Sequence, residues 1–155
     1  MDKQSIIELM PIGVIHSPYK TPAEAPCQGR GLSQISEIEI FAQYEEGLKD
    51  IEGFSHLIIL YYFHKCETHL LLFKMPLDSV PHGIFTTRLP CRPNPIGLSV
   101  VTLLNREGNI LRVKEMDVAD GTPVLDMKPY IPGIDERRGV RIGWLKTFWP
   151  SLNSF

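Results

Sequence analysis

The sequence has no apolar run long enough to cross a lipid bilayer. Its longest strongly apolar run is Leu57–Phe63, whereas a transmembrane helix needs about 20 apolar residues. The first residues, Met1–Leu9, include Asp2 and Glu8 and lack the long apolar segment of a secretory signal peptide. We therefore expect a cytoplasmic protein with no membrane partner.

Cysteine is scarce, and neither sign of charge is in large excess. The 155 residues contain three cysteines, Cys27, Cys66 and Cys91, and carry a formal net charge of −2. An odd number of widely spaced cysteines argues against the disulfide framework of a small secreted protein. Because the net charge is close to zero, no global field attracts nucleic acid, and any RNA contact requires a local basic patch.

Common signatures of nucleotide, zinc and serine hydrolase sites are also missing. The sequence contains no G-x-G-x-x-G, no P-loop, no C-x-x-C and no G-x-S-x-G. His64, Cys66 and His69 are close enough in sequence to share a metal ion, but no fourth ligand stands out. Scattered residues at the end of a strand are the favoured interpretation, and we expect no metal.

Proline and glycine, by contrast, are frequent. Thirteen prolines and twelve glycines favour numerous turns and short strands over long helices. Tyr44, Leu48 and Ile51 fall on one face of a short helix predicted over Ala42–Glu52, and Cys66–Met75 could add a helical turn or two. The ranges with strand-like patterns are Ile12–Ile15, Glu37–Phe41, His56–Phe63, Gly83–Thr87, Gly97–Asn105, Ile110–Val118, Pro123–Met127 and Val140–Leu145.

These elements predict a mainly β protein. The strands do not alternate regularly with helices, so a closed or nearly closed antiparallel-rich barrel is the favoured architecture, with one or two short helices. We expect one domain over residues 1–155, with its core in residues 11–145 and a loose tail at Pro150–Phe155. In Ile110–Val118 the apolar residues change phase, which predicts a β-bulge near Glu115.

The most unusual stretch is Gly83–Val100, which contains the sequence Arg92-Pro93-Asn94-Pro95. Each proline fixes its own φ and pushes the preceding residue towards an extended backbone, so this segment is a stiff loop. Arg88 lies just upstream. A stiff loop that displays two arginines and an asparagine suits recognition of an anionic or amide-bearing ligand. The alternative is a tight connection between strands whose arginines are merely solvated.

Several stretches together resemble the TsaA-like family, also called the TrmO family. They are Pro11–Lys20, Ala25–Gly29, Phe54–Leu57, Phe63–His64, Gly83–Arg88, Arg92–Ser99 and Asp117–Tyr130. Characterised members of this family methylate N6-threonylcarbamoyladenosine next to the anticodon of tRNA, with S-adenosyl-L-methionine as methyl donor. The resemblance therefore implies a single-sheeted β-barrel, S-adenosyl-L-methionine as cofactor, tRNA as partner, and a homodimer with the cofactor near its interface.

The resemblance also implies a cofactor site. Its residues would be Pro26, Cys27, Gln28, Phe63, His64, Arg88, Leu98, Asp117, Asp120, Gly121 and Thr122. The chemistry of these types is suitable, because an amide such as Gln28 can bind adenine or a ribose hydroxyl, and Arg88 can pair with a carboxylate. Asp117 or Asp120 can accept hydrogen bonds from the ribose or the amino group.

Methyl transfer to a weakly nucleophilic nitrogen benefits from a base or an oriented acceptor. His64, Tyr19 and Asp120 are the candidates, and the sequence does not choose among them. Arg92 and Asn94 are assigned to the substrate or to the architecture of the site. Cations available for RNA phosphates are Lys20, Arg30, Arg88, Arg92, Arg137, Arg138 and Arg141, although simple solvation of these side chains is an equal alternative.

The sequence departs from the family pattern in three respects. Cys27 stands where members often have arginine, and Thr86 and Leu89 replace the commoner alanine and serine. The chain also ends soon after the expected barrel, whereas some bacterial members carry a further C-terminal domain. These departures keep two alternatives open: a methyltransferase for another RNA or a small molecule, and a non-catalytic module that binds the cofactor or a nucleotide.

Overall fold

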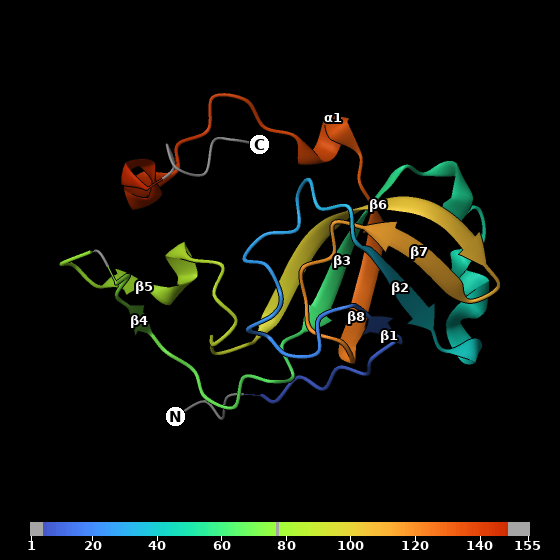
Figure 1. The fold of residues 1–155 in the computed structure, drawn as a ribbon, viewed down its shortest axis with the longest axis horizontal. Coiled ribbons are helices and arrows are strands. Elements are labelled where there is room, and N and C mark those ends of the chain that lie inside the picture. Colours follow the sequence, from blue (N-terminus) through green and yellow to red (C-terminus); the bar gives the residue numbers. More distant parts are fainter. Residues whose placement is uncertain (1–4, 77, 149–155) are drawn as a thin grey trace.

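A computed structural model describes residues 5–76 and 78–148. Within these residues, six strands form a closed antiparallel barrel in the order β1-β2-β7-β6-β3-β8, and β8 pairs with β1 to close it (Figure 1). The barrel strands are β1 Gly13–His16, β2 Ile35–Ile40, β3 His56–Tyr62, β6 Ile96–Glu107, β7 Ile110–Lys114 and β8 Thr122–Pro129. The predicted mainly β barrel is therefore confirmed.

The barrel strands direct alternate side chains into the core and out of it. In β2, Ile38 and Ile40 point inward and are buried, whereas Glu37 and Glu39 point outward and are only partly buried. In β6, Val101 lies in the core while its neighbour Val100 is exposed on the outer face. The core inside the barrel is thus filled by alternate residues of every strand, and the ends of the strands are free to carry loops.

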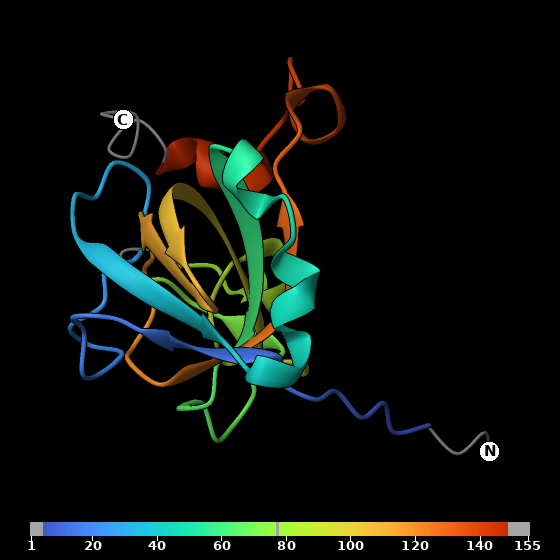
Figure 2. The same ribbon diagram turned by 90° about the vertical axis from the view of Figure 1, so that its right-hand side faces the viewer.

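The predicted helix after β2 exists, but it is two 3₁₀-helices, η1 Ala42–Leu48 and η2 Ile51–Gly53, beside the barrel (Figure 2). Asp50 has a left-handed backbone with φ of 68°, which separates the two turns and prevents one continuous α-helix. Arg106 holds this segment, because its guanidinium donates to the Leu48 carbonyl at 2.9 Å and pairs with Glu52 at 3.2 Å.

The part of the chain that connects β3 to β6, described over residues 63–76 and 78–95, projects from the barrel as an arm. It contains a two-stranded sheet of β4 Leu72–Phe73 and β5 His82–Gly83, followed by the 3₁₀-helix η3 Ile84–Thr86 (Figure 1). The helical turn suggested for Cys66–Met75 and the strand predicted over Gly83–Thr87 are therefore wrong. Side-chain hydroxyls explain the second error, because Thr86 and Thr87 donate to the carbonyls of Gly83 and Ile84 and close a turn.

After β8 the chain forms a short helix, α1 Pro132–Asp135, and then crosses to the arm (Figure 1). The strand predicted over Val140–Leu145 is wrong, because a closed barrel offers no edge and this segment forms the 3₁₀-helix η4 Gly143–Thr147. Trp144 attaches η4 to the arm: its ring stacks on His82 at 3.9 Å, and its N–H donates to the Thr86 hydroxyl at 2.8 Å. The predicted tail, Pro150–Phe155, lies outside the described residues.

The predicted bulge near Glu115 is also wrong. β7 ends at Lys114, and Glu115 adopts a left-handed backbone with φ of 72° that turns the chain out of the sheet. The register shifts in the barrel lie elsewhere, between Leu60 and Tyr61 in β3 and between Leu103 and Asn105 in β6. The phase change in the sequence therefore marks the end of a strand, not an irregularity within it.

Cys66 and Cys91 form a disulfide whose Cα atoms are 5.5 Å apart, and Cys27 is free and exposed. The odd number of cysteines argued against a framework of several bridges, but it does not exclude a single one. In the part of the chain that the structure describes, no helix is long and apolar enough to span a membrane.

Candidate functional site

A cavity of about 170 Å³ lies at the end of the barrel where β3 ends and where β6 and β8 begin. Antiparallel pairing brings these strand ends together, so segments far apart in sequence converge there. The lining residues are Pro22, Ala25, Phe63, His64, Lys65, Cys66, Pro90, Cys91, Asp117, Val118, Ala119 and Thr122. The cavity is thus mainly apolar, with one carboxyl group in its wall.

Phe63 forms one wall because Gly97 leaves room for it. Phe63 packs edge-to-face against Tyr61 with ring centroids 5.3 Å apart, and its N–H donates to the Pro95 carbonyl at 2.8 Å. A Cβ atom at Gly97 would overlap the Tyr61 ring and lie 2.8 Å from the Phe63 ring. Gly97 follows the stiff loop of residues 88–95, the proline loop, and therefore fixes the position of the aromatic wall.

A buried hydrogen-bond chain leads from the barrel core to the cavity. The hydroxyl of Tyr61 lies 2.9 Å from that of Ser99, and Ser99 donates to Asp117 Oδ1 at 2.6 Å. The backbone N–H of Gly29 also donates to the Asp117 carboxylate. Burial raises the pKa of Asp117, and burial followed by the charge of Asp117 raises the pKa of Tyr61.

The loop that contains Pro26, Cys27 and Gln28 is anchored just after these residues. Gly29 packs so closely on the Glu115 carbonyl that any Cβ would overlap it. The Glu115 carboxylate accepts hydrogen bonds from the Gly31 N–H and the Thr102 hydroxyl, both at 2.7 Å. Burial opposes ionisation of Glu115, but these hydrogen bonds outweigh it and lower its pKa. Cys27 and Gln28 are left exposed, and the Gln28 side chain forms no hydrogen bond with any residue that the structure describes.

The Asp117–Thr122 segment divides its side chains between the cavity and β1. Thr122 lines the cavity, and its hydroxyl donates to the Ala119 carbonyl at 2.6 Å. Asp120 does not line the cavity, because its carboxylate accepts from the Ser17 N–H at 2.9 Å. The N–H of Asp120 donates to the carbonyl of Tyr19, so Tyr19 and Asp120 hold the end of β1 to this segment.

His64 lies at the mouth of the cavity and is half-buried. Burial lowers its pKa, and the positive charge of neighbouring Lys65 lowers it further. The imidazole is therefore neutral at pH 7, so it can accept a proton or a hydrogen bond.

The two arginines of the proline loop have different environments. Arg92 donates to the Thr87 carbonyl at 2.9 Å and lies 5.9 Å from the centre of the Phe85 ring, so it braces the loop. Arg88 is exposed and forms no ion pair with the described residues. Its charge nevertheless acts on the Tyr61 hydroxyl, which places it within electrostatic reach of the buried chain from Tyr61 to Asp117.

The structure thus brings together four of the residues expected at the site, Phe63, His64, Asp117 and Thr122. The others adjoin the cavity or lie away from it. Leu98 is on the outer face of β6, 45% exposed, and Asn94 is exposed in the loop. Sequence reasoning missed Tyr61 and Ser99. Their only signal was that each occupies an inward position of a barrel strand, where a polar hydroxyl needs a partner.

Within residues 5–76 and 78–148, no group of three or more His, Cys, Asp or Glu residues is placed to hold a metal ion. His64, Cys66 and His69 therefore do not form a metal cluster, and Cys66 is bonded to Cys91 instead.

Comparison with known proteins identifies the family. Residues 14–136 match the tRNA-methyltransferase O N-terminal domain, and the chain belongs to this family. The probable S-adenosyl-L-methionine-binding protein of Pyrococcus abyssi is 52% identical over 88% of this chain and 74% of that protein. The S-adenosyl-L-methionine-binding protein of Archaeoglobus fulgidus is 49% identical over 82% of this chain and 91% of that protein.

Relatives named as methyltransferases are more distant in sequence. The tRNA (adenine(37)-N6)-methyltransferase of Escherichia coli K12 is 38% identical over 78% of this chain and 56% of that enzyme. A crystal structure of TrmO superposes with a TM-score of 0.76 at 34% identity and covers 90% of this chain. TrmO from Pseudomonas aeruginosa superposes with a TM-score of 0.73 at 32% identity. This chain spans only 64% and 63% of those two solved chains.

Proposed function

We propose that this protein is an S-adenosyl-L-methionine-dependent methyltransferase that modifies N6 of N6-threonylcarbamoyladenosine at position 37 of tRNA. The observation that carries the proposal is the convergence of Ala25, Phe63-His64 and the Asp117–Thr122 segment on one cavity. These residues belong to three of the stretches that resemble the family. Relatives named for cofactor binding and for tRNA adenine methylation support the same assignment.

The residues present suit the cofactor. Apolar walls such as Phe63 can hold an adenine ring and face a sulfonium, while the Asp117 carboxylate can accept from the ribose or the amino group. Arg88, exposed and without an ion pair among the described residues, is available for the amino-acid carboxylate. Ligand pockets typically measure about 300–1,000 Å³, so the cavity of about 170 Å³ receives only part of the cofactor. The rest would extend over Gln28 and Arg88.

The cofactor, when bound, supplies an electrophilic methyl group on its sulfonium. The contribution of this chain is to orient the accepting nitrogen about 3 Å from that methyl and to remove its proton. Neutral His64 is the best placed of the three candidate bases, because Asp120 is engaged by Ser17 and does not line the cavity. Tyr19 contributes its backbone carbonyl to Asp120 and is assigned here to the architecture of the site.

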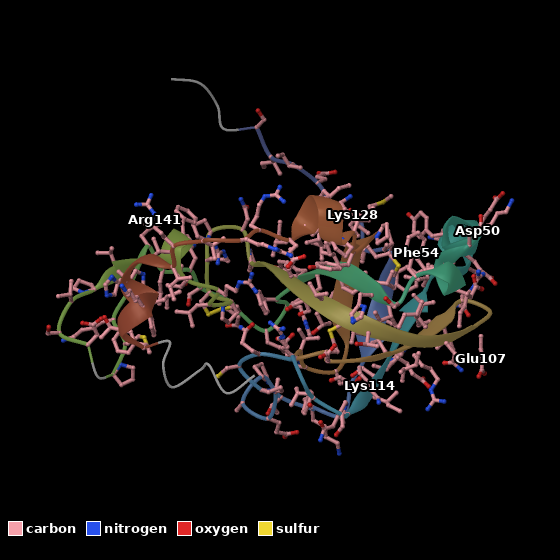
Figure 3. The ribbon with its side chains drawn as sticks, turned by 90° about the horizontal axis from the view of Figure 1, so that it is seen from above. Asp50, Phe54, Glu107, Lys114, Lys128 and Arg141 are labelled. Atoms are coloured by element: carbon pink, nitrogen blue, oxygen red, sulfur yellow. A yellow bond between two sulfur atoms is a disulfide. The ribbon has the colours of Figure 1, made fainter. Side chains whose placement is uncertain are left out.

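We place the tRNA at the end of the molecule that carries the arm. Arg88 lies in the loop beside the cavity, and Arg141 lies on the segment that crosses to the arm (Figure 3). Asp50 and Glu107 lie at the opposite end of the molecule in the same view, where negative charge would repel phosphates (Figure 3). Arg137 and Arg138 precede Arg141 on the same segment after α1 and would add to these cations.

We also propose a homodimer formed through the outer faces of β3 and β6. Tyr62, Ile96, Leu98 and Val100 are apolar or aromatic residues on these faces and are 41%, 41%, 45% and 38% exposed. The pairing of β3 with β6 places Tyr62 opposite Ile96, so these residues form one continuous stripe. Leu98 faces away from the cavity of its own subunit. It would therefore contact a cofactor only across such an interface, in the cavity of the partner subunit. Leu98→Lys should reduce the molar mass measured by light scattering from that of a dimer to that of a monomer.

The test is transfer of tritiated methyl from S-adenosyl-L-methionine to tRNA that carries or lacks the threonylcarbamoyl group. The proposal predicts label on the modified tRNA alone, with a large loss in Arg88→Ala. Arg112→Ala is the matched control, since Arg112 is an exposed arginine that faces Glu37 on the side of the barrel. Absence of transfer by wild-type protein that binds the cofactor would overturn the assignment of the acceptor.

One observation favours a second candidate, a module that binds the cofactor without this activity. Cys27 stands free and exposed at a position often occupied by arginine in the family, and the relatives that are about half identical are named only as binding proteins. Binding of S-adenosyl-L-methionine with no labelled product from any RNA pool would support this candidate.

A further inference from the structure

Two segments that resemble the family's cofactor-binding loops meet at one carboxylate. The Ala25–Gly29 loop and the Asp117–Thr122 segment are distant in sequence, yet the Gly29 N–H donates to the Asp117 side chain. Asp117 lines the cavity, and Gln28 directly precedes Gly29. The orientation of the Asp117 carboxylate therefore contributes to the position of the loop relative to the cavity, together with the contacts of Gly29 and Gly31 with Glu115.

That orientation is imposed from inside the barrel. Tyr61 is 3% exposed and Ser99 is 6% exposed, and they belong to the paired strands β3 and β6. Ser99 donates its only proton to Asp117, so the hydrogen bond between the two hydroxyls runs from Tyr61 to Ser99, and the Tyr61 hydroxyl is also within hydrogen-bonding reach of the Asp117 carboxylate. The chain of donors thus has one direction, from the core of the barrel to the carboxylate at the cavity.

We propose that Tyr61 and Ser99 are positioning residues that hold Asp117, and through it the Gln28 loop, in the geometry that binds the ligand of the cavity. Neither residue touches the ligand. The inference rests on the proposed function only for the identity of that ligand, S-adenosyl-L-methionine.

The arrangement favours an ionised Asp117, because the hydrogen bonds from Ser99, Gly29 and Tyr61 stabilise the carboxylate and lower its pKa against the effect of burial. Protonation of Asp117 would replace an acceptor site with a donor and release one of these partners. The other titratable or charged groups that face this carboxylate are Tyr61 from the core, Arg88 from the proline loop, and His64 and Lys65 from the cavity wall. Loss of the Ser99 hydroxyl removes a hydrogen bond that lowers the pKa of Asp117, so the pKa must rise further.

The experiment compares Ser99→Ala with Ser36→Ala. Ser36 is a matched control, because it is 2% exposed in the same barrel and its hydroxyl has no hydrogen-bond partner among the described residues. The first readout is the amide resonance of Gly29 in the ligand-free protein, followed by NMR as the pH is lowered. The second readout is the Kd for S-adenosyl-L-methionine, measured by calorimetry over the same pH range.

In wild-type protein the Gly29 amide should titrate with Asp117, and ligand binding should weaken as pH falls through the same midpoint. Ser99→Ala should move both midpoints to higher pH and weaken binding at pH 7 about tenfold, the scale of one hydrogen bond to a charged group. Ser36→Ala should move neither midpoint. Tyr61→Phe, which keeps the ring, should shift both in the same direction by less, and provides the test if Ser99→Ala fails to fold.

The outcomes separate this inference from the proposed function. If Ser99→Ala and Tyr61→Phe leave the Gly29 titration and the Kd as in wild type, the positioning role is wrong. If the Gly29 midpoint shifts as expected but wild-type protein binds no S-adenosyl-L-methionine, the hydrogen-bond chain stands and the proposed function fails.

Discussion

Removal of the Cys66–Cys91 disulfide should destabilise the protein and open its cavity. The two cysteines are separated by 25 residues, and the bridge closes the arm at its base. A cross-link of this span restricts the unfolded chain, which by loop-closure entropy contributes about 3.5 kcal/mol to the free energy of unfolding. That is a large share of the roughly 5–15 kcal/mol expected for a whole domain.

The same bond joins two walls of the cavity. Cys66 follows His64 at the exit of β3, while Cys91 follows Pro90 in the proline loop, and all four residues line the cavity. Without the bond, the loop that carries Arg88 is held to the β3 exit only by weaker contacts. We therefore expect ligand affinity to fall together with stability.

The assay is urea unfolding of oxidised wild-type protein beside the Cys66→Ser/Cys91→Ser double variant. With an m-value of about 2 kcal/mol/M, the midpoint should fall by roughly 1.5 to 2 M. Cys27→Ser is the control and should leave the midpoint unchanged, because Cys27 is free and exposed. Thiol titration of the denatured, non-reduced protein should find one free thiol per chain. Three free thiols, or equal midpoints with and without reductant, would refute this reasoning.

Three further predictions concern the barrel and the arm. Gly97→Ala should lower the free energy of unfolding, measured by thermal unfolding, by about 1–3 kcal/mol, because its Cβ would overlap the Tyr61 ring and lie 2.8 Å from the Phe63 ring. Gly47→Ala, with nothing within 4 Å, should leave the free energy of unfolding unchanged or raise it slightly. Glu115 has a lowered pKa, so it stabilises the fold above about pH 5 and loses this contribution as pH falls through its folded pKa. Glu115→Gln should therefore make the free energy of unfolding depend less steeply on pH below pH 5. The same pH dependence in the variant and in wild type would contradict the role assigned to the Glu115 hydrogen bonds. Trp144→Ala should accelerate hydrogen exchange in β4 and β5 but not in the barrel, since the ring stacks on His82 and bonds Thr86 in the arm and otherwise packs on Phe148 beside η4. Equal acceleration in both would show that η4 supports the whole fold.

Local sequence patterns predicted most of the barrel because buried apolar residues recur at every second position in strands such as β2, β3 and β7. Ile38 and Ile40 identify the inner face of β2 without any knowledge of its partners. The patterns failed at Gly83–Thr87 and Val140–Leu145, which are apolar enough for strands. Neither segment can join a barrel that is already closed, and a short run of apolar residues cannot reveal that closure.

The candidate site was predictable only in part, and for a similar reason. Phe63, His64, Asp117 and Thr122 were expected from the resemblance to the family, and the structure places them around one cavity. Ser99 could not be found from the sequence, because its role depends on the pairing of β6 with β3 and on the burial of the group it contacts. Burial and strand pairing are properties of the folded chain, so a pattern read along one segment does not contain them.

The central claim is that the cavity beside Phe63 and Asp117 binds S-adenosyl-L-methionine. A crystal structure of the protein with this compound tests it most directly. We expect the adenosine moiety against Phe63 and the Asp117–Thr122 segment, with the amino-acid carboxylate facing Arg88. Density for the compound at any other place, with this cavity unchanged, would contradict it.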